Sequence, residues 1–196
     1  MIETFVDLRV WFKERLEAAL DRRGVEAGAD TRAYLVELLA AVGVRAAGAV
    51  SERPLALQLA EANETREVPE RIARYRAIGD EALCLSGLFS DHLEKRGVTE
   101  SYVASMGSGA YATVEALALR DAAEARRAFA YRELSVRFRD FSVVLDEVRE
   151  STTMRTPQDI VRLYDKWRRT RSPLVAERLG AEGVFPGFGD GGPTFH

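Results

Sequence analysis

The stretch from residue 69 to residue 119 constrains the fold most, because its apolar and small residues repeat with a helical period. Its first half places such residues three and four positions apart, a spacing that predicts one continuous helix face: Ile72, Tyr75, Gly79, Ala82, Ser86, Phe89 and Leu93. The middle of this face is small, and the second half has its own small cluster from Ser105 to Ala110. We therefore expect two helices, 69–97 and 99–119, that either cross closely or leave room for a ligand.

The connection between these two helices predicts how they are arranged. Gly97 is a typical residue for ending a helix, and Thr99 is a typical N-cap for the next one. A connection this short favours antiparallel neighbours. We expect the small residues of the two helices to face each other.

The rest of the chain reads as further amphipathic helices, and no long segment alternates with the two-residue period of a strand. The expected helices cover residues 3–23, 30–42, 54–63, 121–150, 157–171 and 173–180. The predicted fold class is all-α, as a single-domain bundle of six to eight helices spanning residues 1–180. Residues 181–196 form a separate, non-helical tail, because five glycines interrupt it. Its three phenylalanines, Phe185, Phe188 and Phe195, predict that it is docked rather than solvated.

Composition limits the functions that this chain can have. A formal net charge of −3 argues against a dedicated nucleic-acid-binding protein. One short basic patch (Arg162, Lys166 and Arg169) has a nearer candidate partner in the acidic end of the helix before it. The charged N-terminal segment has no apolar run of the length that a signal peptide or a membrane span needs. We expect a cytoplasmic protein that binds neither nucleic acid nor membrane.

The residues that usually carry chemistry do not form a known catalytic or metal-binding pattern. Cys84 is the only cysteine and His92 is one of two histidines, so neither a cysteine metal cluster nor a Glu-x-x-His di-iron motif is present. His92 is eight residues from Cys84, about 12 Å of helical rise, which is too far to share a proton. The Gly107-Ser108-Gly109 segment lacks the lysine and the preceding strand of a phosphate-binding loop. We expect no cofactor and no metal.

A cavity between helices 69–97 and 99–119 would nevertheless offer polar groups to a ligand. Arginines at the start of the first helix could hold an anion, although they could equally form a solvated surface. The candidate ligand-binding residues are Arg74, Tyr75, Gly79, Ser86, His92, Ser108 and Tyr111.

The segment RYRAIGDEALCLSGLF, followed by SYVASMGSGAY, resembles uncharacterised bacterial all-helical proteins. The resemblance covers about fifty residues. It implies that the segment is one structural unit and implies no chemistry.

Three functions compete. The first is a non-enzymatic helical scaffold or interaction module that binds another protein or itself, with a homo-oligomer as one form. The second is a small-molecule-binding or sensor protein with its cavity between the two central helices. The third is an enzyme, which would need Tyr102, Tyr111, Glu115, Asp80 or His92 to meet in that cavity. A filled seam between the helices favours the first, and an enclosed polar cavity favours the others.

Overall fold

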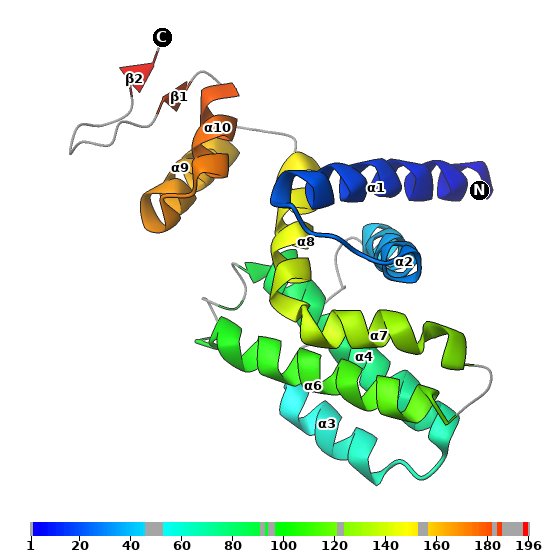
Figure 1. Cartoon of the computed structure of the whole chain (residues 1–196). Coiled ribbons are helices and arrows are strands. Elements are labelled where there is room, and N and C mark those ends of the chain that lie inside the picture. The colour runs from blue at the N-terminus through cyan, green and yellow to red at the C-terminus, as the bar shows by residue number, and fades with distance from the viewer. Residues whose placement is uncertain are drawn as a thin grey trace. The chain divides into compact units, whose positions relative to one another are not determined.

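The fold was obtained as a computed structural model, in which the described residues are 2–45, 53–90, 93, 97–120, 124–152, 157–181, 184–185 and 194–195. These residues form nine α-helices, one 3-10 helix and two strands of two residues each (Figure 1). The predicted all-α class is confirmed. The chain divides into two compact units, Met1–Ser151 and Thr152–His196.

The first unit holds most of the helices. Their bounds are α1 (Ile2–Arg23), α2 (Ala29–Arg45), α3 (Leu55–Glu64), α4 (Val68–Gly87), α6 (Glu100–Ala118), η1 (Ala125–Arg127), α7 (Ala128–Val136) and α8 (Phe138–Thr152). One apolar core joins them, with Leu16, Leu35, Leu83, Tyr111, Leu134 and Phe141 among its fully buried members. In the described part of the chain, no helix is long and apolar enough to cross a membrane.

Two helix boundaries follow the local signals. Gly24 after α1 and Gly97 before α6 have φ of 61° and 65°, a left-handed conformation that glycine adopts without a steric penalty. Thr99 is the N-cap of α6, where its side-chain oxygen accepts a hydrogen bond from the backbone N–H of Tyr102 at 3.4 Å. The predicted cap at Thr99 is confirmed, whereas the helix expected to run from residue 69 to Gly97 ends earlier.

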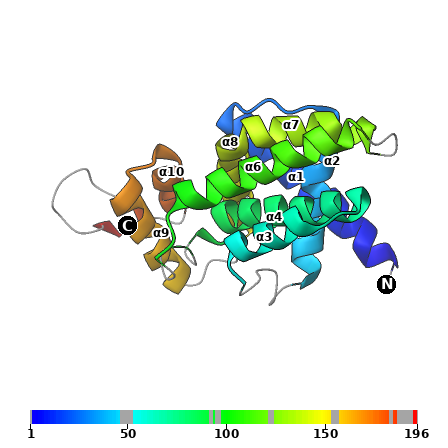
Figure 2. The same ribbon diagram turned by 90° about the horizontal axis from the view of Figure 1, so that it is seen from below.

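Helices α4 and α6 form the central pair. They lie side by side in both views, and α6 also packs against α7 (Figures 1 and 2). Gly79 lies against the ring of Tyr111, whereas Ala82, one turn further along α4, lies against Gly107, one turn earlier on α6. The order of these contacts shows that the two helices run antiparallel, as predicted.

Helix α4 is shorter than predicted. It ends at Gly87, and the N–H groups of Leu88 and Phe89 both donate to the Cys84 carbonyl, at 2.8 and 3.0 Å. A Cβ on Gly87 would lie 2.6 Å from the Leu145 Cβ, so α8 crosses α4 in near contact at this point. Phe89 and Leu93 still contact the core. The periodicity therefore identified core residues correctly but wrongly extended one helix through them.

The helix predicted over 121–150 is also interrupted. Its described part is η1 followed by α7 and α8, with a break at Arg137, where φ is −112° and ψ is 30°. Neither glycine nor proline marks this position. The Arg137 guanidinium donates to the carbonyl of Glu26, which is distant in the sequence, and contacts Asp140 and the Phe141 ring in the following turn. Splitting one expected helix raises the number above the predicted six to eight.

Helix α1 is joined to α8 through a buried carboxylate. Glu147 has no exposed surface, and Arg22 and Arg23 from the end of α1 each lie 3.2 Å from one of its oxygens. Removing one partner of such a pair is costly, because it leaves a dehydrated charge.

The second unit has its own small core. Helices α9 (Pro157–Thr170) and α10 (Pro173–Ala181) bury Leu163, Trp167, Val175 and Leu179 between them. Strand β1 (Val184–Phe185) contacts α10 and pairs antiparallel with β2 (Thr194–Phe195). The division at residue 152 differs from the expected bundle of 1–180 and tail of 181–196, because α9 and α10 cluster with the tail strands. The side chains of the three tail phenylalanines lie outside the described residues.

Candidate functional site

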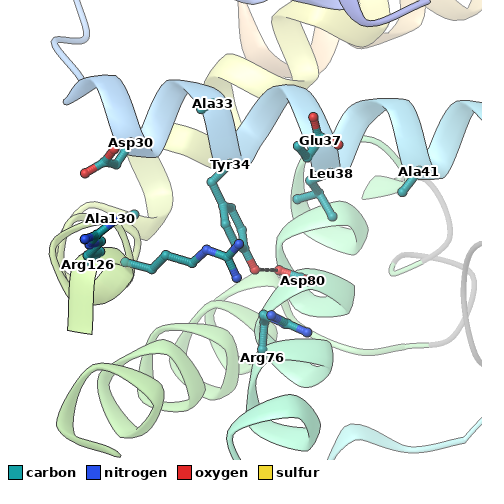
Figure 3. Close-up of a pocket in the computed structure, with 11 residues that line it drawn as sticks. Asp30, Ala33, Tyr34, Glu37, Leu38, Ala41, Arg76, Asp80, Arg126 and Ala130 are labelled. Carbon is teal, nitrogen blue, oxygen red and sulfur yellow. Dashed lines mark hydrogen bonds between the residues drawn. The ribbon is translucent and has the colours of Figure 1, made fainter. Parts of the chain in front are cut away.

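A cleft of about 840 Å³ opens between α2, α4 and the start of α7 (Figure 3). Helix α2 presents one face to it, since its lining residues recur every three or four positions. The lining residues are Asp30, Ala33, Tyr34, Glu37, Leu38 and Ala41 from α2, Arg76 and Asp80 from α4, and Arg126, Arg127 and Ala130 from η1 and α7. Three segments that are far apart in the sequence thus build one site.

Asp80 ties the cleft to the core. Tyr34 reaches across from α2 and donates its hydroxyl hydrogen to Asp80 Oδ1 at 2.5 Å (Figure 3). Tyr111, fully buried on α6, donates to the same oxygen at 2.8 Å. A single carboxylate oxygen therefore links α2, α4 and α6. Hydrogen bonds to a carboxylate are stronger than those between neutral groups.

The protonation of this network follows from its burial. Loss of water raises the pKa of Asp80 above its ordinary value, although the two tyrosine hydroxyls and the nearby Arg76 act in the opposite direction. Burial, together with the negative charge of Asp80, raises the pKa of Tyr34 and of Tyr111. Both phenols therefore remain neutral hydrogen-bond donors near neutral pH.

The arginines of the cleft differ in how they are compensated. Arg127 forms an ion pair with Glu124 at 3.6 Å. Arg76 is half-buried and lies one turn before Asp80. Burial lowers the pKa of Arg76, but its attraction to the Tyr131 hydroxyl and to Asp80 outweighs burial, so the pKa is raised. Within the described residues, however, neither Arg76 nor Arg126 forms an ion pair with a carboxylate. The Tyr131 hydroxyl is buried and has no hydrogen-bond partner of ordinary geometry.

The acidic groups of the cleft are compensated. Glu37 is paired with Arg9 at 2.7 Å. Asp30 lies in the first turn of α2, where the positive end of the helix dipole stabilises a negative charge. Helix α2 begins at Ala29, one residue before the expected start at residue 30. Glu133 from α7 takes the capping role, since its carboxylate accepts from the Gly28 N–H at 3.0 Å and from the Thr31 hydroxyl at 2.5 Å.

The seam between α4 and α6, where the sequence left room for a cavity, is filled by aromatic rings. A Cβ on Gly79 would lie 2.8 Å from the Tyr111 ring. A Cβ on Gly107 would lie 2.4 Å from the Phe138 ring and 2.7 Å from the Ala82 Cβ. Rings from α6 and α8 thus fill the space that the absent glycine side chains leave, as expected of a close-packed protein interior.

The residues predicted to bind a ligand are distributed over this seam and its surroundings, and none of those described lines the cleft. Gly79 and Tyr111 pack against each other, and Tyr111 reaches the cleft only through its bond to Asp80. Arg74 is exposed and pairs with Glu70 at 2.8 Å. Tyr75 is buried and donates to the Asn63 side-chain oxygen.

The remaining predicted residues do not join the network. Ser86 is buried on α4 and its hydroxyl has no hydrogen-bond partner. Ser108 donates to the Ser105 carbonyl at 3.2 Å. His92 lies outside the described residues.

Of the residues that an enzyme would need, Tyr111 and Asp80 are joined by a hydrogen bond, and His92 lies outside the part of the chain that the structure describes. Tyr102 is exposed near the start of α6 and does not line the cleft. No three histidine, cysteine or acidic side chains of the described part could hold a metal ion together. Cys84 is buried, and burial and the nearby acids raise the pKa of its thiol, which keeps it protonated.

The sequence does not reveal the cleft, because Tyr34 fits the apolar period of its helix and Arg76 and Asp80, four residues apart, fit a pair on a helix surface. One signal was available. A tyrosine in an aliphatic stripe needs a partner for its hydroxyl when it is buried, and Asp80 is that partner. Comparison of the chain with protein-family models, with curated proteins and with solved structures found no match.

Proposed function

We propose that this protein binds a small organic molecule in the cleft between α2, α4 and α7. The observation that carries the proposal is the cleft itself, of about 840 Å³. It is lined by four apolar side chains, by Tyr34 and by six charged side chains, among them the partly buried Asp80 and two arginines that form no ion pair with a described carboxylate. Its volume lies within the range of ligand sites, which are usually largely apolar with a few polar groups that fix orientation.

The hydrogen-bond network supports a preformed site. Tyr34 and Asp80 are each held by a partner on another helix, so they would lose little conformational freedom when a ligand binds. The described side-chain hydrogen bonds of Asp80 come from Tyr34 and Tyr111, whose raised pKa values keep both phenols neutral donors. Binding or sensing therefore agrees with the site better than catalysis does.

Native mass spectrometry of the purified protein, followed by a thermal-shift screen of small metabolites, tests this function. Ala33 is exposed and lines the cleft, so Ala33→Trp would fill it without disturbing the core. We expect this variant to fold and to lose the bound or stabilising compound. Ala116→Trp, at an exposed position of α6 outside the cleft, is the matched control. A ligand that survives Ala33→Trp would contradict the proposal.

A scaffold or interaction module is the second candidate. Two large apolar side chains of α7, Phe129 and Val136, are 58% and 77% exposed, and their seven-residue spacing places them on one helix face. Analytical ultracentrifugation of the wild type and of Phe129→Ser/Val136→Ser tests this candidate. Self-association that the double substitution abolishes would favour it, and a monomer in both cases would count against self-association.

A further inference from the structure

We infer that the ligand of the cleft is an organic acid with an apolar body, whose acid group is bound by Arg76 and Arg126. This inference rests on the proposed function and adds the chemical class of the ligand. It comes from an inventory of the charges that line the cleft.

Most charged side chains of the cleft have a close ion-pair or hydrogen-bond partner, and two arginines form no ion pair with a described carboxylate. Glu37 is paired with Arg9, Arg127 with Glu124, and Asp30 with the positive end of α2. Asp80 accepts two tyrosine hydroxyl groups. The guanidinium groups of Arg76 and Arg126 form no ion pair with a described carboxylate, although Asp80, one turn along α4, attracts Arg76.

These two guanidinium groups suit an anionic group. Arg76 is half-buried, so its guanidinium group has lost part of its hydration. An anion with hydrogen-bond acceptors would replace the lost water. Carboxylates and phosphates fit the planar fork of a guanidinium with two parallel hydrogen bonds. The Tyr131 hydroxyl is buried beside Arg76, with no hydrogen-bond partner of ordinary geometry.

On the other side of Tyr34 the cleft is lined by two apolar side chains, with the ion-paired Glu37 beside them. Leu38 and Ala41 lie along α2 on the far side of Tyr34 from Arg126 and Asp30 (Figure 3). A ligand lying along α2 would thus place its acid group near the arginines and its apolar part against Leu38 and Ala41. Burying such a body contributes roughly in proportion to the apolar area removed from water.

A series of probes that differ only in the head group tests the inference by isothermal titration calorimetry. The probes are 4-phenylbutanoate, 4-phenylbutanol and 4-phenylbutylamine, with 4-phenylbutyl phosphate to distinguish a carboxylate from a phosphate and inorganic phosphate to test the anion alone. We expect an acid to bind at least about tenfold more tightly than the alcohol, as hydrogen bonds to charged groups predict. The amine should bind most weakly.

Three arginine variants locate the effect. Arg76→Gln should reduce the preference for the acid over the alcohol to about twofold or less, and Arg126→Gln should reduce it in part. Arg74→Gln removes an arginine of the same helix that does not line the cleft and is ion-paired with Glu70, so the preference should not change. If Arg76→Gln does not fold, Arg126→Gln alone decides the outcome.

The outcomes separate this inference from the proposed function. The inference would be overturned if the amine bound most tightly or if all head groups bound equally. It would also be overturned if both arginine variants kept the preference for the acid. If no probe binds but another compound is lost in Ala33→Trp, the acid class is wrong and the cleft is still a binding site. If no compound binds in a way that depends on the cleft, both proposals fail.

Discussion

Helix α4 has two neighbouring faces that meet its surroundings in different ways. Toward α6 it presents Gly79 and Ala82, and large rings fill the space that these small residues leave. Toward α2 it presents Arg76 and Asp80, and a cleft remains open there. The comparison teaches that small residues on a helix indicate close packing more than a cavity, because a neighbouring ring can take up the volume. Long charged side chains keep helices apart, because their charged ends stay hydrated.

The largest expected effect comes from adding a side chain in the filled seam between α4 and α6. Gly107→Leu should lower the free energy of unfolding by about 3 kcal/mol or more, the upper end of overpacking effects, because even a Cβ would overlap the Phe138 ring. Chemical denaturation measures the change. Gly109→Leu is the control, since nothing lies within 4 Å of a Cβ at this exposed position two residues away. Equal losses in both variants would mean that the seam is not tightly filled.

Substituting the two tyrosines that donate to Asp80 compares the two faces of α4 directly. Tyr111→Phe should cost about 1.5–3 kcal/mol, the usual value of a hydrogen bond to a charged group, because Tyr111 is fully buried and no water can replace its hydroxyl. Tyr34→Phe should cost less than about 1 kcal/mol, since water in the cleft can reach Asp80. Urea denaturation of both variants provides the test. The reverse order would show that the open face holds the stronger bond.

The raised pKa of Asp80 predicts that the free energy of unfolding depends on pH. Its pKa is raised in the folded state, so its contribution to stability is fully present below its ordinary pKa of 3.8 and is lost as the pH rises through the folded value. Asp80→Asn keeps an oxygen that can accept both tyrosine hydroxyls but removes the titration. The unfolding free energy of the wild type minus that of Asp80→Asn should therefore fall as the pH rises from below 3.8 through the folded-state pKa, by about 1.4 kcal/mol for each unit by which the pKa is raised.

Denaturation at a series of pH values measures this difference, and carbon NMR of the Asp80 carboxyl group measures its pKa. A difference that grew as the pH rose would contradict the prediction, because it would mean that the tyrosines and Arg76 outweigh burial.

The smallest expected effect is a gain. Gly109→Ala should raise the free energy of unfolding by about 0.5–1 kcal/mol, because alanine lowers the conformational entropy of the unfolded chain and nothing opposes the added methyl group. Gly107→Ala should lower it, since the same methyl group would meet Phe138 and Ala82. Thermal denaturation of the two variants checks the signs. A gain in both would show that Phe138 can move aside at little cost.

The local signals in the sequence were sufficient for the helical class, for the antiparallel central pair and for several helix ends. Gly97 and Thr99 act through their own backbone conformation and the next turn of helix, so their effects could be read without the fold. The apolar period likewise identified Phe89 and Leu93 as core residues. It could not show that α4 ends at Gly87, because that end coincides with contacts from α8, more than fifty residues away.

The sequence by itself determined which segments are helices and which of their faces are apolar, because hydrogen bonding and periodicity act over three or four residues. Only the tertiary structure decided the break at Arg137, the filling of the seam by Tyr111 and Phe138, and the cleft beside Asp80. Each of these depends on the distance and direction between helices that are far apart in the chain. Those quantities are set by how all the side chains pack together, and no local pattern carries them.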